Sequence, residues 1–373
     1  MRPIRDLATL GRRGLHVAAN PDAGVRPGEA PVLPAPEPDA AALSARGLST
    51  VYTDGKSQVH AVRDVSFDLQ PSERLGIVGE SGSGKSALAL SILGLLEPPG
   101  RVVAGEVRLA GRDIAKLSDR QLGGIRGKEI SLVLQDPSSA LDPVKTIGSQ
   151  MIEAIAVHEP GLKRQALRKR AAELLREVEI SQSERRLDDY PHQYSGGMRQ
   201  RVAIAIAIAN NPRVLIADEP TTALDVTTQA QVLALLDRLV DQHRTAVILI
   251  THNLGIVSDF CDSVAVMYAG RLVETSGVDH IFAAPTHPYS EALLKCVPNP
   301  EQLAQGPLPA IQGFPPSLSE LPTGCAFAPR CPVGKDLEQC QQVTPVPHHV
   351  VGPSGPAEVE CHFAEERIAQ VRS

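Results

Sequence analysis

The chain of 373 residues contains no tryptophan, and aromatic residues make up only 3% of it. Proteins that bind single-stranded nucleic acids stack the bases on aromatic side chains, so this scarcity argues against that class. The formal net charge of −6 points the same way, because nucleic-acid binders usually carry a basic surface. We therefore expect no nucleic-acid partner.

Long hydrophobic runs are also missing from the sequence. The longest unbroken apolar run extends only from Val202 to Ala209, whereas a membrane-spanning helix needs about 20 such residues. Arg12 and Arg13 interrupt the one apolar stretch near the N-terminus, which is not typical of a secretory signal peptide. We expect the protein to stay in the cytoplasm and to reach a membrane only through a partner.

The chain does contain a glycine-rich loop, Gly-Glu-Ser-Gly-Ser-Gly-Lys-Ser, directly after the apolar run Leu75–Val78. The spacing matches G-x-x-x-x-G-K-[ST], in which backbone N–H groups bind the phosphates of a nucleoside triphosphate. In this pattern the lysine reaches the β- and γ-phosphates, and the last hydroxyl ligates Mg²⁺. The predicted nucleotide-binding residues of the loop are Gly79, Glu80, Ser81, Gly82, Ser83, Gly84, Lys85 and Ser86.

Two acidic residues, Asp218 and Glu219, follow the buried-strand pattern Val214–Ala217. A phosphate-binding loop needs such a second element to hold the metal and to activate water. We expect Asp218 to orient Mg²⁺ through its water ligands. Glu219 is expected to act as the general base that polarises the water attacking the γ-phosphate.

Polar side chains also end two further predicted strands. Gln135 follows the strand expected at 130–134, where its amide oxygen is placed to complete the coordination of Mg²⁺. His252 comes just after the strand expected at 246–250, where its imidazole is placed to hydrogen-bond the γ-phosphate. Ligand sites lie at the carboxyl ends of strands in α/β sheets, so both residues are candidates for the same site.

The remaining pattern predicts an α/β protein. Alternating apolar residues predict antiparallel strands at 48–52 and 60–69, and later strands alternate with helices as in a mostly parallel sheet. Residues 201–210 alternate with the strand period, but their alanines favour a buried helix. The basic run 163–170 is interpreted as a solvent-facing helix surface paired with Glu173, Glu177 and Glu179.

The segment Tyr-Ser-Gly-Gly-Met-Arg-Gln-Arg at 194–201 resembles the signature of ABC ATPases. Met198 stands where this family usually has glutamine, a change that leaves the backbone donors in place. The resemblance covers about residues 45–285. It implies an ABC-type P-loop NTPase with a mostly parallel sheet core, an antiparallel β subdomain and a helical subdomain at about 144–197.

The resemblance assigns roles to four further positions. Gln135 is similar to the family's Q-loop glutamine, and His252 is similar to its switch histidine. Thr-Ala-Leu-Asp before the helix expected at 225–242 resembles the D-loop and ends in Asp225. Tyr52 falls where the family stacks an aromatic ring on the adenine of ATP, although packing on the sheet is the alternative role.

A dimer is also implied by this resemblance. Two ABC domains face each other head to tail, with ATP between the phosphate-binding loop of one and the signature of the other. Ser195, Gly196 and Gly197 are therefore expected to touch the ATP held by the partner subunit.

The C-terminal part of the chain resembles the extension of the oligopeptide and dipeptide ABC importer ATPases, a branch that includes nickel importers. The resemblance rests on Pro-Thr-His-Pro-Tyr-Ser at 285–290, on Gly-Cys-Ala-Phe-Ala-Pro-Arg-Cys-Pro at 324–332, and on the segment at 190–198. We thus expect a Pro- and Ala-rich disordered tail at 1–43, an ABC ATPase domain at 44–285 and this extension at 286–373.

This branch implies an ATPase subunit that powers the import of di- or oligopeptides. Its expected partners are a non-identical sister ATPase, two membrane permeases and an extracytoplasmic peptide-binding protein, at the cytoplasmic face of the inner membrane. Nickel chelates or other small solutes are the alternative cargo. A soluble ABC ATPase without a transport role is the other alternative, but the second ATPase half or long coiled coil of that class is not found in this sequence.

Four of the six cysteines fall in the extension. Disulfides are rare in a reducing cytosol, and a segment this small cannot build its own core, so a metal site is predicted. Some members of the family carry a [4Fe–4S] cluster there, and Zn²⁺ or four unliganded thiols are the alternatives. The expected ligands are Cys325, Cys331, Cys340 and Cys361. Cys261 and Cys296 are interpreted as small core residues on helices.

Overall fold

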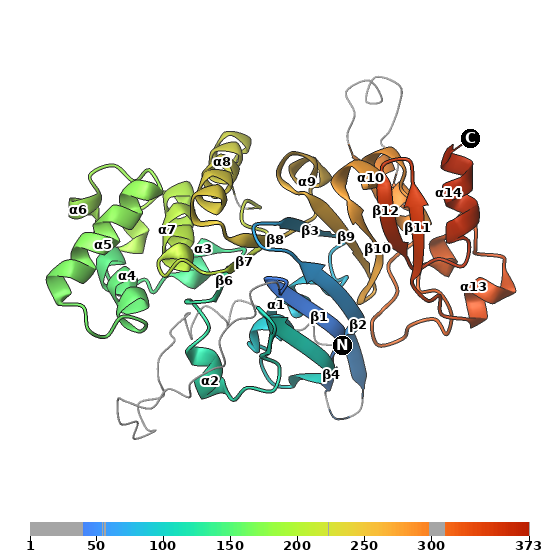
Figure 1. Cartoon of the computed structure of the whole chain (residues 1–373), viewed down its shortest axis with the longest axis horizontal. Helices are drawn as coiled ribbons and strands as arrows, with labels where there is room; N and C mark the ends of the chain where they lie inside the picture. The colour runs from blue at the N-terminus through green and yellow to red at the C-terminus, as the bar shows by residue number, and fades with distance from the viewer. Residues whose placement is uncertain (1–39, 54, 56, 223, 298–309, 373) are drawn as a thin grey trace. The chain divides into compact units, whose positions relative to one another are not determined.

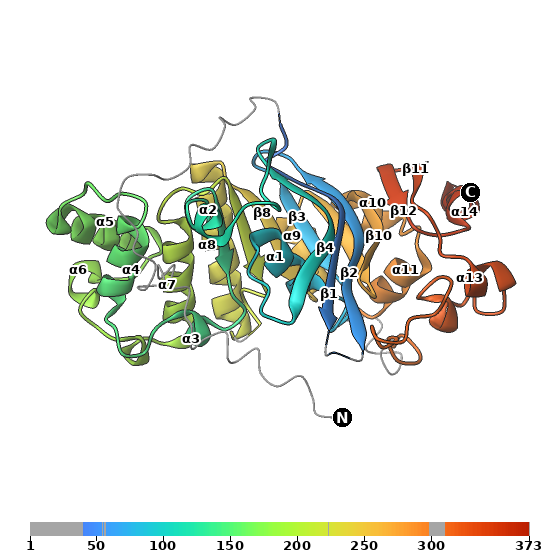
Figure 2. The same ribbon diagram turned by 90° about the horizontal axis from the view of Figure 1, so that it is seen from below.

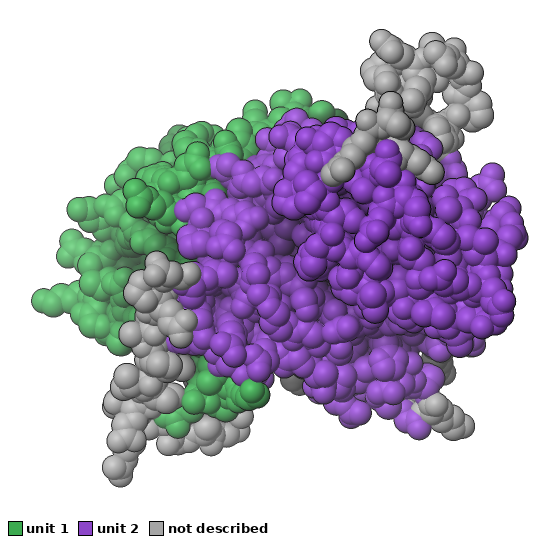
Figure 3. All heavy atoms as spheres, turned by 45° about the vertical axis from the view of Figure 1, so that its right-hand side comes forward, with its two compact units in different colours: residues 1–36, 116–247 green, residues 37–115, 248–373 purple. Residues whose placement is uncertain are grey.

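The computed structural model describes residues 40–53, 55, 57–222, 224–297 and 310–372 (Figure 1). The tail expected at 1–43 lies outside the described residues up to residue 39, and the first described strand begins at Leu43. The chain divides into two compact units, 1–36 with 116–247 and 37–115 with 248–373, which are coloured separately in Figure 3. We call them the first and the second unit.

The second unit contains the predicted antiparallel subdomain. Its four strands lie in the order β2-β1-β4-β5, and Figure 2 shows β1, β2 and β4 side by side. Leu43 is fully buried and pairs with Leu69 on one side and with Leu109 on the other. The strands are β1 (Leu43–Thr53), β2 (Gln58–Leu69), β4 (Gly100–Leu109) and β5 (Arg112–Asp113).

The main sheet of the second unit is mixed, whereas the sequence suggested a mostly parallel one. β3 pairs parallel with β9, but β10 returns antiparallel on β9, and β12 and β11 then add two antiparallel strands from the extension. The order is β11-β12-β10-β9-β3-β8. These strands are β3 (Arg74–Val78), β8 (Ala246–Thr251), β9 (Ser263–Tyr268), β10 (Arg271–Gly277), β11 (His348–Gly352) and β12 (Gly355–Val359).

The helices of the second unit are mostly short. α1 ends at Leu93, where its C-cap Gly94 adopts a left-handed conformation with a φ of 63°. The helical segments are α1 (Lys85–Leu93), α9 (Leu254–Phe260), α10 (Val278–Ala283), α11 (Pro288–Lys295), η3 (Ala328–Arg330), α13 (Glu338–Gln342) and α14 (Ala364–Arg372).

The first unit pairs two parallel strands, β6 (Ile130–Val133) and β7 (Val214–Asp218), and is otherwise helical. The segment with the ambiguous alternation lies within a helix, as predicted, because α7 is apolar around most of its circumference and is buried. The helical segments are α2 (Asp119–Gly123), α3 (Pro137–Ala140), α4 (Ile147–Ala156), α5 (Arg164–Glu177), α6 (Ser183–Arg186), η2 (Pro191–Gln193), α7 (Gly196–Ile208) and α8 (Val226–His243).

The basic run at 163–170 lies at the start of α5, where its charges face solvent and acidic partners. Lys169 Nζ lies 4.0 Å from Glu173 Oε1, and Arg170 Nη1 lies 3.9 Å from Glu177 Oε1. Glu179 instead pairs with two arginines outside the run, Arg201 and Arg238. The helix-surface interpretation is therefore confirmed, with a different partner for Glu179. No helix in the described part of the chain is long and apolar enough to cross a membrane.

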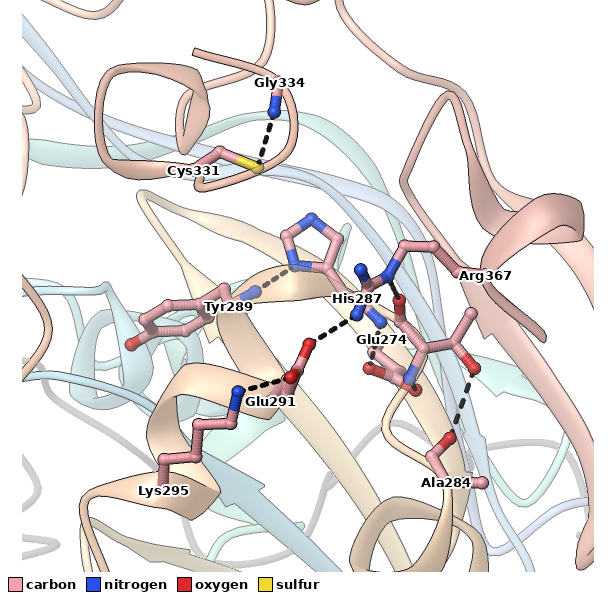
Figure 4. Close-up of polar contacts among 10 residues, drawn as sticks. Glu274, Ala284, His287, Tyr289, Glu291, Lys295, Cys331, Gly334 and Arg367 are labelled. Carbon is pink, nitrogen blue, oxygen red and sulfur yellow. Dashed lines mark hydrogen bonds and ion pairs between the residues drawn. The ribbon is translucent and has the colours of Figure 1, made fainter. Parts of the chain in front are cut away.

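The extension is joined to the sheet through a buried carboxylate on β10 (Figure 4). Glu274 has no exposed surface and accepts the backbone N–H groups of Thr286 and His287, each at 2.8 Å. Burial raises the pKa of Glu274, while these donors act in the opposite direction. Arg367 of α14 donates to the carbonyl oxygen of Thr286 at 2.6 Å. These contacts fix the turn that starts α11.

The imidazole of His287 caps α11 from a fully buried position. Its Nδ1 accepts the backbone N–H of Tyr289 at 3.0 Å, a contact that requires this nitrogen to be unprotonated. Burial, reinforced by the charge of Arg367, lowers the pKa of His287 to about 3. His287 is therefore neutral throughout the physiological range.

This burial predicts a loss of stability in mild acid. Between pH 6.5 and about 3, His287 is protonated in the unfolded chain but stays neutral in the folded protein. The free energy of unfolding therefore falls as the pH falls. In His287→Asn an amide oxygen can keep the helix cap, but nothing titrates. We expect the fall in unfolding free energy from pH 7 to pH 5, measured with urea, to be about 2 kcal/mol smaller in the variant. Equal falls in both proteins would contradict this.

Candidate nucleotide-binding site

The glycine-rich loop connects β3 to α1 in the second unit, as the sequence predicts. Gly79 and Gly84 have φ values of 155° and 107°. A Cβ atom on Gly79 would lie 2.1 Å from the carbonyl oxygen of Met267, and one on Gly84 would lie 2.2 Å from that of Ala61. The loop therefore passes so close to the backbones of β9 and β2 that only glycine fits at these two positions.

The lysine of the loop is buried and folds back over it. Lys85 Nζ donates to the carbonyl oxygens of Gly79 and Glu80 at 2.8 and 2.9 Å, and lies 3.3 Å from Ser83 Oγ. Ser86 follows in the first turn of α1 and is half-buried. The positive N-terminal end of α1 and the Lys85 ammonium group thus lie together at the loop. This concentration of positive charge suits the binding of an anionic phosphate group.

Tyr52 and His252 also belong to the second unit. Tyr52 is half-buried on β1, and its ring covers Gly100, where a Cβ atom would lie only 2.6 Å from Cε1. This contact is the sheet packing that was the alternative to adenine stacking, and it leaves part of the ring accessible. His252 lies exposed just beyond β8, before the cap of α9 at Asn253.

Gln135 and Glu219 meet in the first unit. Gln135 Nε2 donates to Glu219 Oε2 at 2.7 Å, and Thr222 Oγ1 donates to the same oxygen at 2.9 Å. Glu219 has a φ of 47°, a left-handed conformation that is uncommon for residues other than glycine. Asp218 precedes it as the buried last residue of β7. Thr222 is a partner of Glu219 that the motifs did not predict, although its position three residues after Glu219, within reach of a turn, was a usable signal.

The segment at 194–201 forms the start of α7, with Ser195 as its N-cap. Ser195 Oγ accepts the N–H of Met198 at 3.3 Å, and Gly196 and Gly197 form the first turn. A Cβ atom on Gly197 would lie 2.6 Å from Cγ2 of Thr228 on α8. The exposed N-terminus of α7 presents backbone N–H groups and the positive end of a helix, as an anion site requires.

Asp225 caps α8 and contacts the same threonine. Its carboxylate accepts the backbone N–H of Thr228 at 3.0 Å and the hydroxyl at 2.8 Å. These hydrogen bonds lower the pKa of Asp225. Thr228 therefore lies between Gly197 and Asp225, and links the two segments that resemble the signature and the D-loop.

The four cysteines of the extension line a single pocket, together with Phe327, Gly334 and Phe363. Gly334 N–H donates to Cys331 Sγ at 3.2 Å (Figure 4). Burial and the neighbouring thiols raise the pKa of Cys325 to about 12 and that of Cys361 to about 11. Among the described residues, no group of three or more His, Cys, Asp or Glu side chains stands in the arrangement of a metal-ion site.

The other two cysteines lie apart from this pocket. Cys261 is buried with its Sγ close to Gly76, and burial raises its pKa to about 12, which confirms its interpretation as a core residue. Cys296 is only half-buried, so the same interpretation is wrong there. α11 ends at Lys295, and Cys296 is its C-cap.

Family models match the two main parts of the chain. The model described as "ABC transporter" matches residues 62–222, and the one described as "Oligopeptide/dipeptide transporter, C-terminal region" matches residues 273–340. A solved dimer of the ATP-binding cassette MJ0796 bound to ADP and Pi is 30% identical, with a TM-score of 0.57 over 63% of this chain and 98% of that one. The fold and the loop thus define an ATP-binding cassette of the ABC ATPase class.

Two curated relatives narrow the family. "Probable peptide ABC transporter ATP-binding protein y4tR" of Sinorhizobium fredii is 49% identical over 82% of this chain and 90% of its own length. "Oligopeptide transport ATP-binding protein OppD" of Bacillus subtilis is 47% identical over 77% of this chain and 80% of its own length. The chain belongs to the family of ATP-binding subunits of peptide-importing ABC transporters, and it is the ATPase component of such a complex.

The contact between Gly197 and Thr228 predicts a stability defect with a specific rescue. Gly197→Ala places a methyl group against Thr228 Cγ2, which should cost about 1–3 kcal/mol and lower the melting temperature by several degrees. Thr228→Ser removes that methyl group and keeps the hydroxyl that Asp225 binds. We expect the double variant to recover most of the loss, measured against Thr228→Ser alone. A double variant no more stable than Gly197→Ala would contradict this interpretation.

Proposed function

We propose that the chain hydrolyses ATP with the residues identified from its motifs. Gly79 to Ser86 would bind the phosphates, and Tyr52 would stack on adenine. The observation that carries the proposal is that Gln135, after β6, and Thr222 both donate to the Glu219 carboxylate, directly after β7, and so hold it in a defined position. Glu219 is the general base of this proposal, and His252 holds the γ-phosphate and the attacking water in line.

Mg²⁺ is the expected cofactor, and the donor types fit it. The Ser86 hydroxyl, the Gln135 amide oxygen and the Asp218 carboxylate are hard oxygen ligands of the kind that Mg²⁺ prefers, the last acting through water. When bound, the ion neutralises charge on the β- and γ-phosphates. The Gln135 amide nitrogen is meanwhile bonded to Glu219.

The assembly follows from the same family. We propose a head-to-tail heterodimer with a sister ATPase, in which Ser195, Gly196 and Gly197 reach the ATP of the partner and Asp225 lies beside that contact. Two permeases and an extracytoplasmic peptide-binding protein would complete the importer, with this chain peripheral at the cytoplasmic face of the inner membrane. The dimeric cassette structure and the peptide transporters among the relatives support this assembly.

The cargo of the family is peptide, and the chain's own residues do not select among peptides. Di- and oligopeptides both remain within the proposal, and nickel chelates or other small solutes are the alternative. The domain boundaries proposed for this chain are 44–285 for the ATPase domain and 286–373 for the extension.

A [4Fe–4S] cluster is proposed for the cysteine pocket. Four thiols facing one pocket, with a backbone N–H aimed at one sulfur, match the ligand set and the hydrogen bonding of iron–sulfur sites. Zn²⁺ held by the same four cysteines is the alternative, because the spacing of the cysteines along the chain is typical of neither metal. Bound metal would also stabilise the thiolates that burial disfavours.

The base assignment is tested with Glu219→Gln. Because the amide cannot take a proton, turnover of the purified transporter should fall by about 10²–10⁴, the usual contribution of a general base. Binding of a fluorescent ATP analogue should persist. Glu184→Gln, which changes an exposed carboxylate on α6, is the matched control and should hydrolyse ATP normally. Near-normal turnover in Glu219→Gln would remove Glu219 from this role.

The cluster is tested by metal analysis of protein purified without oxygen. We expect about four iron and four sulfide per chain, because a [4Fe–4S] cluster contains that many. Cys331→Ser should lose the iron, whereas Cys296→Ser, outside the pocket, should keep it. One zinc per chain would establish the alternative metal, and neither metal at a stoichiometric level would contradict a metal site.

A further inference from the structure

The second residue of the nucleotide loop is bound by an arginine of the extension. Arg330 donates to both carboxylate oxygens of Glu80, at 2.6 and 3.0 Å, across 250 positions of sequence within the second unit. The side chains are 4% and 26% exposed, respectively. A two-pronged pair that is shielded from water holds its geometry far better than a surface ion pair does.

The guanidinium of Arg330 is fixed by its surroundings. It lies over the rings of Tyr268 and Phe327, 5.9 and 6.0 Å from their centroids, and its Nη1 lies 3.3 Å from Tyr268 Oη. Its Nε donates to the carbonyl oxygen of Gln312 at 3.0 Å. Arg330 is therefore held in place from several sides, and Glu80 is held by it.

A second contact joins the same loop residue to α11. The backbone N–H of Glu80 donates to Tyr289 Oη at 2.9 Å. Tyr289 is fully buried and packs on Tyr268 and Phe327, with ring centroids 4.5 and 5.3 Å away. Since Lys85 Nζ is bonded to the Glu80 carbonyl oxygen, the position of Glu80 also sets the position of that ammonium group.

An unpaired carboxylate at position 80 would oppose the binding of a triphosphate. The loop gathers N–H groups and Lys85 around a site for an anion, and a negative charge in the same loop repels that anion. Arg330 removes this repulsion by neutralising Glu80 and holding its carboxylate on the side of the extension. We propose that Arg330 is a positioning residue for nucleotide binding. The extension then helps to hold the nucleotide-binding loop in the conformation that binds ATP. This inference rests on the proposed role of residues 79–86.

The test compares the ATP affinities of variants that remove the charge of Arg330, the charge of Glu80, or both. In Arg330→Gln the Glu80 carboxylate is left uncompensated, and the dissociation constant of a fluorescent ATP analogue should rise about tenfold. Glu80→Gln supplies the reference affinity, because its amide does not repel phosphate. The double variant E80Q/R330Q should bind within a few-fold of Glu80→Gln, so that the loss caused by Arg330→Gln depends on the Glu80 charge. In steady-state hydrolysis the defect of Arg330→Gln should appear in KM much more than in kcat.

A role in packing alone predicts a different pattern. It would leave E80Q/R330Q as weak as Arg330→Gln, and that result, or an unchanged dissociation constant in Arg330→Gln, would overturn the proposal. If Arg330→Gln does not fold, Arg330→Lys carries the test. The lysine keeps the charge without the two-pronged geometry, so it should weaken binding when Glu80 is present and have no effect when Glu80→Gln is added, as in E80Q/R330K. An equal effect in both backgrounds would count against the proposal.

Lys85→Ala separates this inference from the function on which it rests. If Lys85→Ala loses nucleotide while Arg330→Gln binds normally, only the role of Arg330 fails. If Lys85→Ala also binds normally, the loop is not the phosphate site and both proposals fall.

Discussion

A carboxylate with no access to water organises the second unit. Glu274 sits on β10 and accepts two backbone N–H groups from the turn before α11. That turn places His287 as the cap of α11 and directs Tyr289 to the backbone amide of Glu80. A desolvated carboxyl group tolerates only a small displacement of its donors, because each lost hydrogen bond leaves a buried polar atom without a partner. The position of the nucleotide loop thus depends on Glu274, a residue outside the loop itself.

Paired charges contribute to the contact between the extension and the cassette. Arg330 binds Glu80, and Arg271 binds Glu360 with two hydrogen bonds at 2.7 and 2.8 Å. Shielded pairs of this kind add little net stability compared with apolar packing, since removing both charges from water is costly. Their contribution is to geometry, because a planar guanidinium accepts a carboxylate in few orientations. The extension is therefore held in a defined register on the cassette rather than merely attached to it.

The parts of the site that the sequence predicted are those set by local backbone. The glycine-rich loop, the acids after β7 and the signature segment at 194–201 each follow from a few adjacent residues. Contacts between distant segments could not be predicted. Nothing near Glu80 indicates Arg330 as its partner, and nothing near Glu219 indicates its left-handed backbone. The mixed sheet was missed for the same reason, because pairing of β10 with β12 is a long-range choice.

The pairing of β12 with β10 has a consequence for how the chain is made. Three residues of β10, Glu274 to Ser276, hydrogen-bond with β12 on the side away from β9. During synthesis β10 leaves the ribosome long before Val359 does, so for that interval the growing cassette presents an open sheet edge. Unpaired edges of this kind recruit other strands and favour aggregation. β12 therefore covers this edge of β10 only after synthesis has passed Val359, and a chain truncated before β11 would leave the edge unpaired and prone to self-association.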